Sequence, residues 1–385
     1  MIITDMTDSR NGEKPKIALV YDRVVKFGGA ERVLLSLHKL YPDAPLYTAI
    51  YDRNKAPWAD SFEVRTSFLK HLPLADRYHE MLPFLTPYAF ENFDFSDFDI
   101  VLSVTSSDAK SIITKPGTLH ICYCLTPTRY LWSGYNEYLA EPGVGLLNPL
   151  FRAGMRLFAP ALRRWDLLSA KRPDTYLAIS ETVKKRLSRF YREKAEVVYP
   201  PLDTGSFSLP DKKTRGDYFL IVSRLVPYKG LDYAISLFSK TGQKLVVIGS
   251  GVDNRRLQNL AGNSVKFITG NLTDRKLCWY YQNCRSLIFP GEEDFGLTAV
   301  EAQACGSPVI ALALGGAAES IRHGQTGLLY GEKTEASLEN ALRIFETMEF
   351  NPRLLRENAI RFSEAVFMRK MKAYILRKWR KEQSV

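Results

Sequence analysis

The stretch SLIFPGEEDFGLTAVEAQACGSPVIAL, residues 286–312, contains one complete unit of the pattern that decides the fold. The apolar runs SLIFP (286–290) and PVIAL (308–312) predict two buried strands. The residues between them predict a helix that begins near Gly296. Apolar strands that alternate with helices are typical of parallel sheets whose two faces are covered by helices.

The same alternation of short apolar runs and helical patterns extends over nearly the whole chain. Strands are predicted at 16–22, 46–51, 99–105, 120–125 and 175–180 in the first half, and at 217–223, 244–250 and 265–270 in the second. An amphipathic helix is predicted over 28–41 and a basic helix over 181–191. Each half therefore has enough strands for a doubly wound sheet, and the expected fold class is α/β, with two Rossmann-like domains that face each other across a cleft.

A proline pair in VVYPPLDTGSF (197–207) marks the boundary between the two halves, because paired prolines disfavour a helix and stiffen the chain. The expected division is a disordered lead-in, a first domain, a linker, a second domain and a C-terminal helix that packs back on the first domain. These segments are residues 1–15, 16–198, 199–207, 208–362 and 363–385.

Composition favours a globular protein of a reducing compartment. Of the 385 residues, 45% are hydrophobic and 25% charged, and the N-terminal residues lack the apolar segment of a secretory signal. The five cysteines are odd in number and lie mostly in apolar runs, which favours a cytoplasmic location over a disulfide framework. A net charge of +11 suits phosphorylated substrates, an anionic membrane surface or nucleic acid. Nucleic acid is disfavoured, because the basic residues are scattered and no motif that reads bases is present.

Two cations follow a predicted strand in SRLVPYKG (223–230). Arg224 and Lys229 would lie at the carboxyl end of that strand, where a guanidinium fork and an ammonium group could bind a diphosphate. A solvated basic loop is the alternative.

Two acids, Glu293 and Glu301, lie eight residues apart and bracket the predicted start of a helix. The free N–H groups at a helix start favour an anion, whereas carboxylates there can accept hydrogen bonds from vicinal sugar hydroxyls. Together with the two cations, these groups predict a site for a nucleotide sugar. Glu301 could alternatively stabilise the first turn of its own helix.

Two glycine clusters also follow strands. Gly28 and Gly29 could let backbone amides approach a phosphate at a helix start, or could simply form a tight turn. Gly249 and Gly251 lack the third glycine of a dinucleotide-binding fingerprint, since residue 254 is asparagine, so a Rossmann dehydrogenase is disfavoured.

These features together resemble the retaining family 4 (group 1) glycosyltransferases, which have the GT-B fold. The resemblance rests on the E-x7-E element of Glu293 and Glu301, the Arg224/Lys229 pair, the glycine turn at 28–29 and YPPLDT at 199–204. Within that family, CYCLTPTRYLW (122–132) resembles the bacterial O-antigen and polysaccharide mannosyltransferases, which commonly carry CYCHTPxRYLW.

The resemblance implies a role for each matching position. Glu293 would contact the transferred sugar, Glu301 the ribose, and Arg224 and Lys229 the leaving diphosphate, without a metal ion or other cofactor. Amides of the helix start, Gly29 and a residue near the base would complete the donor site; these positions are Phe295, Gly296, Leu297, Thr298, Gly28, Gly29 and Leu272.

One position departs from the family pattern. The family histidine before Thr-Pro is Leu125 here, and leucine cannot bond a hydroxyl or share a proton. Arg129 and Tyr130, a few residues further on, are the candidates to take its place.

The resemblance therefore implies transfer of mannose from GDP-mannose to a lipid-linked or growing glycan, as in O-antigen and lipopolysaccharide synthesis, at the inner face of the plasma membrane. A UDP-sugar donor (UDP-glucose or UDP-N-acetylglucosamine) and a non-catalytic partner subunit are the alternatives. The aromatic and basic segment 147–168 suits a membrane surface or an ordinary amphipathic helix. His120, Cys122 and Cys124 would share one face of a strand as zinc ligands do, but no fourth ligand is evident, and no metal site is predicted.

Overall fold

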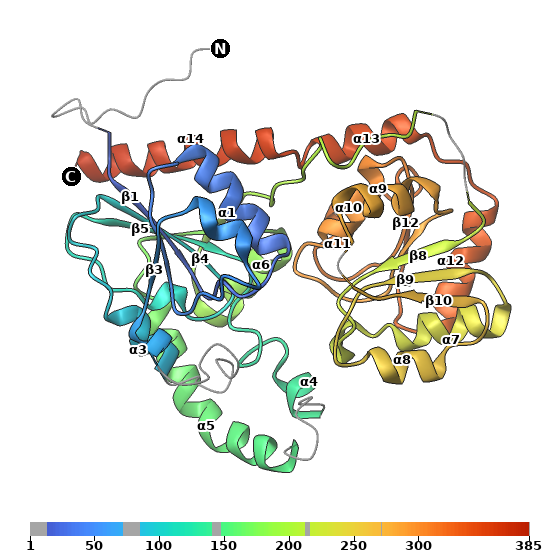
Figure 1. Cartoon of the computed structure of the whole chain (residues 1–385), viewed down its shortest axis with the longest axis horizontal. Helices are drawn as coiled ribbons and strands as arrows, with labels where there is room; N and C mark the ends of the chain where they lie inside the picture. Colours follow the sequence, from blue (N-terminus) through green and yellow to red (C-terminus); the bar gives the residue numbers. More distant parts are fainter. Residues whose placement is uncertain (1–13, 72–84, 141–147, 212–215, 271, 385) are drawn as a thin grey trace. The chain divides into compact units, whose positions relative to one another are not determined.

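The computed structural model describes residues 14–71, 85–140, 148–211, 216–270 and 272–384, so most of the expected lead-in lies outside the described residues. The chain divides into two compact units. Unit 1 comprises the residues up to Val198 and those from Phe367 onward, and unit 2 comprises Tyr199–Val366. Each unit is built on one parallel sheet covered by helices, which confirms the predicted α/β class (Figure 1).

Unit 1 has a sheet of seven described strands in the order β3-β2-β1-β4-β5-β6-β7. Strands β2 and β3 lie on one side of β1, and β4 to β7 lie on the other. The carboxyl ends of β1 and β4 therefore flank a topological switch point, the place where α/β sheets bind ligands. The strands are β1 (Ile17–Tyr21), β2 (Leu46–Thr48), β3 (Val64–Thr66), β4 (Ile100–Thr105), β5 (Leu119–Cys124), β6 (Thr175–Ala178) and β7 (Ala195–Val197).

The basic helix predicted over 181–191 is an α-helix only as far as Arg186. It continues as a π-helical turn to Tyr191 and ends where Arg192 adopts a left-handed conformation, with φ of 59°. The helices of unit 1 are α1 (Gly29–Leu40), α3 (Leu85–Glu91), α4 (Tyr135–Ala140), α5 (Asn148–Ser169), α6 (Glu181–Arg186) and α14 (Glu364–Gln383), with short helical turns at Pro57–Ser61, Phe68–His71 and Ala109–Ser111.

Unit 2 has a sheet of six described strands in the order β10-β9-β8-β11-β12-β13, and its switch point lies between β8 and β11. The strands are β8 (Phe219–Val222), β9 (Leu245–Ile248), β10 (Val265–Ile268), β11 (Leu287–Phe289), β12 (Val309–Leu312) and β13 (Gly327–Tyr330). The helices are α7 (Asp232–Thr241), α8 (Asn254–Leu260), α9 (Asp274–Asn283), α10 (Leu297–Ala304), α11 (Ala317–Ser320), α12 (Glu335–Glu346) and α13 (Pro352–Ile360), with a 3-10 turn at Pro227–Lys229.

The strands that the sequence pattern did not predict, β3, β7 and β13, all lie at sheet edges. They contain three or four residues each, and one of them begins with glycine. In β3 (VRT) and β7 (AEV) a charged residue interrupts the segment, so neither forms the apolar run by which a buried strand is recognised.

The expected linker and the C-terminal helix are both packed. Leu202 is buried, and its backbone bonds to Phe362 and Glu364 within unit 2. From Phe367 onward α14 belongs to unit 1, where the Phe367 ring packs 5.9 Å from the ring of Tyr123. The hydroxyls of Tyr374 and Thr175 lie 2.5 Å apart and fix the next turns of α14 to β6.

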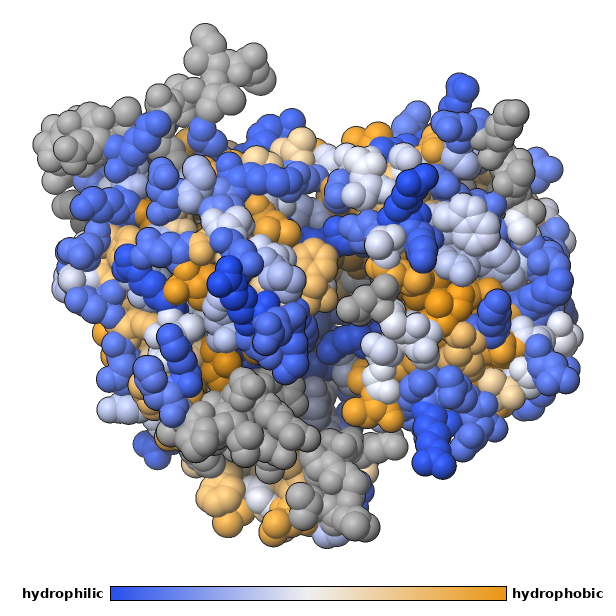
Figure 2. Space-filling view, in the orientation of Figure 1, coloured by the Kyte–Doolittle hydropathy of each residue, from blue (hydrophilic) through white to orange (hydrophobic). Residues whose placement is uncertain are grey.

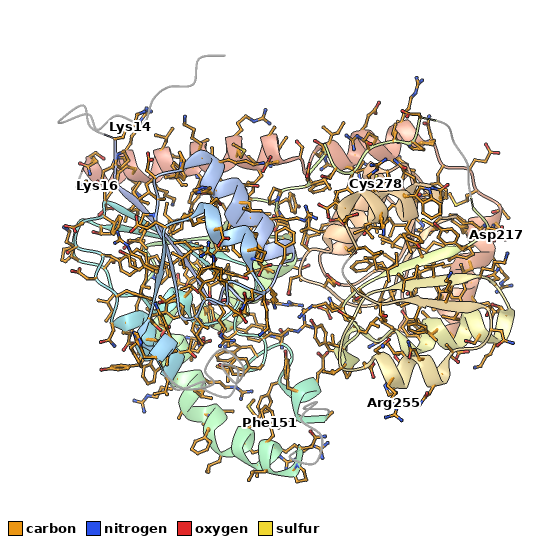
Figure 3. All side chains as sticks on the ribbon, in the orientation of Figure 1. Lys14, Lys16, Phe151, Asp217, Arg255 and Cys278 are labelled. Carbon is orange, nitrogen blue, oxygen red and sulfur yellow. The ribbon has the colours of Figure 1, made fainter. Side chains whose placement is uncertain are left out.

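Helix α5 buries only four of its 22 residues, and in Figure 1 it extends away from the sheet of unit 1. Phe151 marks its first turns in Figure 3. Within the described residues, none of the helices combines the length and the apolar character that crossing a membrane requires.

Candidate functional site

The predicted helix start in unit 2 lies at Gly296, directly before α10. Gly296 has φ of +85°, and a Cβ atom there would lie 2.9 Å from the ring of Phe289. Only glycine meets both conditions without strain. The preceding Phe295 is buried, with its ring 5.4 Å from the rings of Tyr199 and Phe362. The chain is therefore held rigidly where the helix begins.

The first turn of α10 presents polar groups that the helix itself does not use. Leu297 and Thr298 are its first two residues, so their N–H groups have no partner one turn earlier. The Thr298 hydroxyl oxygen is buried and has no hydrogen-bond partner among the described residues. These groups, at the positive end of the helix dipole, could bind an anion or a sugar hydroxyl.

Lys229 and Glu293 form an ion pair between Nζ and Oε1. Lys229 ends the 3-10 turn that follows β8, and Glu293 lies in the loop between β11 and α10. Their loops pack closely, since a Cβ atom on Gly291 would lie 2.4 Å from the Lys229 carbonyl oxygen. The Lys229 side chain is 8% exposed and that of Glu293 25% exposed, so the carboxylate faces the more open side of the pair.

Arg224 lies in the same loop as Lys229, and Tyr228 connects them. The Arg224 guanidinium donates to the Tyr228 hydroxyl over 2.5 Å. The guanidinium of Arg224 and the ammonium of Lys229 lie 5.9 and 5.3 Å from the centroid of the Tyr228 ring. Both cations therefore meet at the carboxyl end of β8, as the sequence predicts.

Glu301 is the fifth residue of α10, so it lies beyond the first turn of that helix. Its side chain is almost fully buried, and its Oε2 atom accepts a hydrogen bond of 2.9 Å from the hydroxyl of Tyr281 on α9. Burial and the nearby carboxylate raise the pKa of Tyr281 well above its ordinary value, which keeps this hydroxyl a donor. Because Glu301 lies beyond the first turn of α10, it does not act only by stabilising that turn.

Leu272, the residue predicted to lie near the base, is half-buried and precedes α9.

In unit 1, the glycine turn before α1 adjoins a carboxylate. Gly28 is extended, and a Cβ atom there would lie 3.3 Å from Oε2 of Glu31. Glu31 lies in the first turn of α1, is buried and accepts a hydrogen bond of 2.6 Å from the Tyr21 hydroxyl. An anion bound at Gly28 and Gly29 would therefore meet a carboxylate as well as helix N–H groups.

The loop that follows β5 carries the three positions predicted to serve the acceptor or the sugar. Leu125 is half-buried, and its N–H bonds to the carbonyl of Thr105 over 2.8 Å. Arg129 forms an ion pair of 3.7 Å with Glu137. Burial raises the pKa of Tyr130, and the carboxylates of Asp108 and Asp166 raise it further, so its hydroxyl stays protonated.

A buried polar cluster at the carboxyl ends of β1, β4 and β5 was not predicted from the sequence. Its buried ion pair joins Lys110 Nζ to Asp166 Oδ1 over 2.6 Å, and Asp22, Arg23 and Asp108 lie at the ends of β1 and β4. Burial lowers the pKa of Lys110, but the carboxylates of Asp166 and Asp108 outweigh it and raise that pKa. A signal was present, because YDR and SSDAK follow two strands that were themselves predicted.

His120 and Cys122 lie inside the sheet on β5. The His120 ring nitrogen Nε2 lies 2.8 Å from the Ser103 hydroxyl, and burial lowers the pKa of His120 to about 3. Burial raises the pKa of the Cys122 thiol to about 12. Across the described part of the chain, no group of three or more His, Cys, Asp or Glu side chains is arranged to hold a metal ion.

The sequence of unit 2 matches a known family model, and curated proteins share sequence with part of the chain. Residues 207–362 match the family model described as glycosyl transferases group 1. The uncharacterized glycosyltransferase MJ1178 of Methanocaldococcus jannaschii is 28% identical over 198 residues, which are 50% of this chain and 55% of that protein. The GDP-mannose-dependent alpha-mannosyltransferase of Mycolicibacterium smegmatis is 37% identical over 109 residues, 28% of each chain. The matched stretch thus spans about half or less of these curated relatives.

Over the whole chain the similarity is one of structure. The crystal structure of Anabaena Alr3699/HepE in complex with UDP-glucose superposes with a TM-score of 0.68, covering 94% of this chain and 99% of that one at 17% identity. At this identity the likeness establishes the fold. The chain therefore has the GT-B fold of glycosyltransferases, and its match to the group 1 glycosyltransferase model lies within residues 207–362.

Proposed function

We propose that this protein is a retaining glycosyltransferase, which moves a hexosyl group from a nucleoside-diphosphate sugar to an acceptor hydroxyl. The observation that carries the proposal is the grouping of the Lys229–Glu293 pair with the start of α10. Both lie at the carboxyl ends of β8 and β11, which are neighbours at the switch point of the unit 2 sheet. Cations and helix N–H groups suit a diphosphate, and Glu293 suits a sugar hydroxyl.

In the proposed reaction the bond between the anomeric carbon and the diphosphate oxygen breaks, and negative charge develops on the diphosphate. Lys229, Arg224 and the first N–H groups of α10 would stabilise that charge, so these groups would do the work of a metal ion. The leaving phosphate oxygen would accept the proton of the acceptor hydroxyl, whose oxygen bonds to the anomeric carbon on the same face. On this proposal transfer is unaffected by EDTA.

We propose mannose from GDP-mannose as the transferred group. The support is the resemblance of CYCLTPTRYLW to polysaccharide mannosyltransferases and the 37% identity to a GDP-mannose-dependent relative. A UDP-sugar donor is the rival, and its support is the shared fold with a protein crystallised with UDP-glucose. Leu125 supports a third possibility, a nucleotide-binding partner without transferase activity, because leucine cannot replace the hydrogen bonds of the family histidine.

The proposed acceptor is a lipid-linked or growing glycan, such as an O-antigen or lipopolysaccharide precursor, at the inner face of the plasma membrane. Helix α5 supports this location, because it exposes leucines beside arginines. Leu157 is 71% and Leu168 63% exposed, and Arg156 and Arg164 are exposed near them. Figure 2 shows apolar side chains at the lower edge of unit 1, where Figure 1 places α5. A helix of this kind can lie in a membrane interface.

The test is a thermal-shift titration with GDP, UDP and ADP, followed by a transfer assay with the matching sugar donor. A ligand at a hundred times its Kd stabilises the folded state by about 2.7 kcal/mol. A shift selective for GDP supports the mannose donor, a shift selective for UDP supports the rival, and no shift refutes a nucleotide-sugar site.

Glu293→Gln then separates the enzyme from a non-catalytic binder. This variant is expected to keep its melting temperature and nucleotide shift while losing transfer, because the amide keeps the shape of the carboxylate but not its charge. Near-normal turnover in Glu293→Gln would refute the role assigned to Glu293. A nucleotide shift without transfer in the wild-type protein would favour the binding subunit.

A further inference from the structure

The carboxyl ends of β1 and β4 in unit 1 are joined by one carboxylate, that of Asp22. Its two oxygens accept hydrogen bonds from the Thr105 hydroxyl (2.7 Å), the Ser106 backbone (2.7 Å) and hydroxyl (3.1 Å), the Asp108 backbone (3.0 Å) and the Ala109 backbone (2.8 Å). Five donors on one carboxylate fix the loop after β4 rigidly. This loop sets the position of the next acid, Asp108.

Asp108 is buried beside the partly exposed Arg23, whose side chain is 20% exposed, and the two side chains are not hydrogen-bonded to each other. Asp108 is 5% exposed, and its Oδ2 atom lies 3.6 Å from the Arg23 guanidinium, beyond hydrogen-bond distance. Asp108 Oδ2, Arg23 Nε and the hydroxyl oxygen of Thr126 are all buried, and none has a hydrogen-bond partner within the described residues. Buried polar groups in native proteins are nearly always bonded, so the two unbonded groups of Arg23 and Asp108, whose side chains lie 3.6 Å apart, indicate a place that a further molecule completes.

The chemistry of the cluster limits what that molecule can be. An anion would meet the Asp108 carboxylate, and a cation would meet the Arg23 guanidinium. A neutral hydroxyl group suits both, because it donates to the carboxylate and accepts from the guanidinium. Two adjacent hydroxyls on a sugar ring present this combination of donors and acceptors at the spacing of neighbouring side chains.

The same cluster holds the loop that carries Leu125 and Tyr130. The Thr128 hydroxyl and the Trp132 indole each donate to Asp166 over 2.6 Å, which ties this loop to α5. Lys110, two residues after Asp108, pairs with the same Asp166 carboxylate over 2.6 Å. The loop that carries Leu125 and Tyr130 and the pair of Arg23 with Asp108 therefore belong to one rigid part of unit 1.

We propose that Arg23 and Asp108 form the hydroxyl-binding site for the glycosyl acceptor in unit 1. Asp108 accepts a hydrogen bond from one sugar hydroxyl, Arg23 donates to a neighbouring hydroxyl oxygen, and Thr126 bonds a third group. The pair selects a carbohydrate acceptor over a phosphorylated or cationic one. This inference rests on the proposed function, and it assigns a binding role that needs no proton transfer.

The experiment measures carbohydrate binding to the full chain without nucleotide. Saturation-transfer NMR is recorded with the methyl α-glycosides of mannose, glucose and galactose on the wild type, Asp108→Asn, Arg23→Met and Thr126→Val. Asp60→Asn, at an exposed acid of the same unit, is the matched control. At least one glycoside is expected to bind the wild type and Asp60→Asn, with affinity at least tenfold lower in Asp108→Asn and Arg23→Met.

Two outcomes overturn the proposal: no glycoside binds the wild type, or the glycosides bind Asp108→Asn and Arg23→Met as well as the wild type. If Asp108→Asn does not fold, Arg23→Met and the near-isosteric Thr126→Val decide the question. The nucleotide thermal shift is recorded on the same samples and is expected to be unchanged in every variant. Glycoside binding without any nucleotide shift would leave this site standing and refute the proposed donor site, so the two failures are distinguishable.

Discussion

At the scale of single residues, the Lys229–Glu293 pair connects two proposed contacts. Lys229 would bind the leaving diphosphate, and Glu293 would bind the transferred sugar. In the chain without ligand, each side chain neutralises the other. A diphosphate bound at the start of α10 would compete with Glu293 for the Lys229 ammonium. Binding of the donor would thereby turn the carboxylate toward the sugar hydroxyls, and the ion pair would act as the element that couples the two contacts.

Lys229→Met is expected to weaken binding of the preferred nucleoside diphosphate by at least tenfold, or about 1.4 kcal/mol. The reason is the loss of the ammonium group that pairs with Glu293, and calorimetric titration measures the affinity. Glu293→Gln is the matched variant, and it is expected to bind as tightly as the wild type or more tightly, because Lys229 loses its competing partner. Equal weakening in both variants would show that the pair acts only in stability.

The buried Asp108 predicts a specific dependence of stability on pH. Burial raises the pKa of Asp108 to about 6 from 3.8, against the opposing effect of Arg23 and Lys110. Because the folded state binds this proton more tightly, the stabilisation is complete below about pH 4 and is lost as pH rises to about 6. The rise in the pKa of Asp108 from 3.8 to about 6 corresponds to a free energy on the order of 3 kcal/mol.

Asp108→Asn removes this titration, so its stability relative to the wild type is expected to rise between pH 4 and pH 7. Melting temperatures of both proteins across that range measure the effect. A constant difference between the two proteins would contradict the raised pKa that burial gives this carboxylate.

At the scale of elements, the start of α10 depends on Gly296. Gly296→Ala places a Cβ atom in a left-handed backbone and 2.9 Å from the ring of Phe289. Gly324→Ala is the control, since Gly324 has φ of +78° and open space around its Cβ position. The control is expected to lose about 1–2 kcal/mol from backbone strain alone. Gly296→Ala is expected to lose more, as measured by urea unfolding; equal losses would mean that the Phe289 contact relaxes.

Helix α5 is expected to bind anionic membranes through its exposed apolar face. Leu157→Glu with Leu168→Glu should abolish cosedimentation with phosphatidylglycerol vesicles while leaving the melting temperature nearly unchanged, because both side chains are exposed. Ile344→Glu, at an exposed position of α12 in unit 2, is the control and should bind vesicles as the wild type does. Unchanged binding by the double variant would remove α5 from the membrane contact.

At the scale of the whole molecule, the C-terminal helix belongs to the first unit although it follows the second in sequence. From Phe367 onward α14 buries side chains within unit 1; these are Phe367, Met371, Tyr374, Ile375 and Trp379. A stop after Val366 is therefore expected to lower the stability of unit 1 by several kcal/mol, since each buried side chain contributes about 1.5–3 kcal/mol. Unit 2 should keep its nucleotide-induced shift.

Calorimetry would resolve the two effects, and a stop after Lys381, which removes only the last residues, is the control. Loss of the nucleotide shift together with the stability of unit 1 would mean that the two units do not fold independently.

The sequence by itself determined the inner strands of both sheets, the edge strand β10, the start of α10 and the loop that holds both cations. Each of these depends on a local signal: an apolar run long enough for a strand, a glycine before a helix, or cations directly after a strand. The α/β class and two parallel sheets follow from such signals alone.

Only the tertiary structure decided which side chains meet. The ion pair of Lys229 with Glu293, the contact of Glu301 with Tyr281 and the pair of Arg23 with Asp108 each join segments on different strands or helices. Strand order determines which carboxyl ends become neighbours, and three of the four described edge strands that complete that order, β3, β7 and β13, were not predicted from the sequence. Burial likewise arises from the packed whole, which is why the unbonded polar groups of unit 1 became visible only in the folded chain.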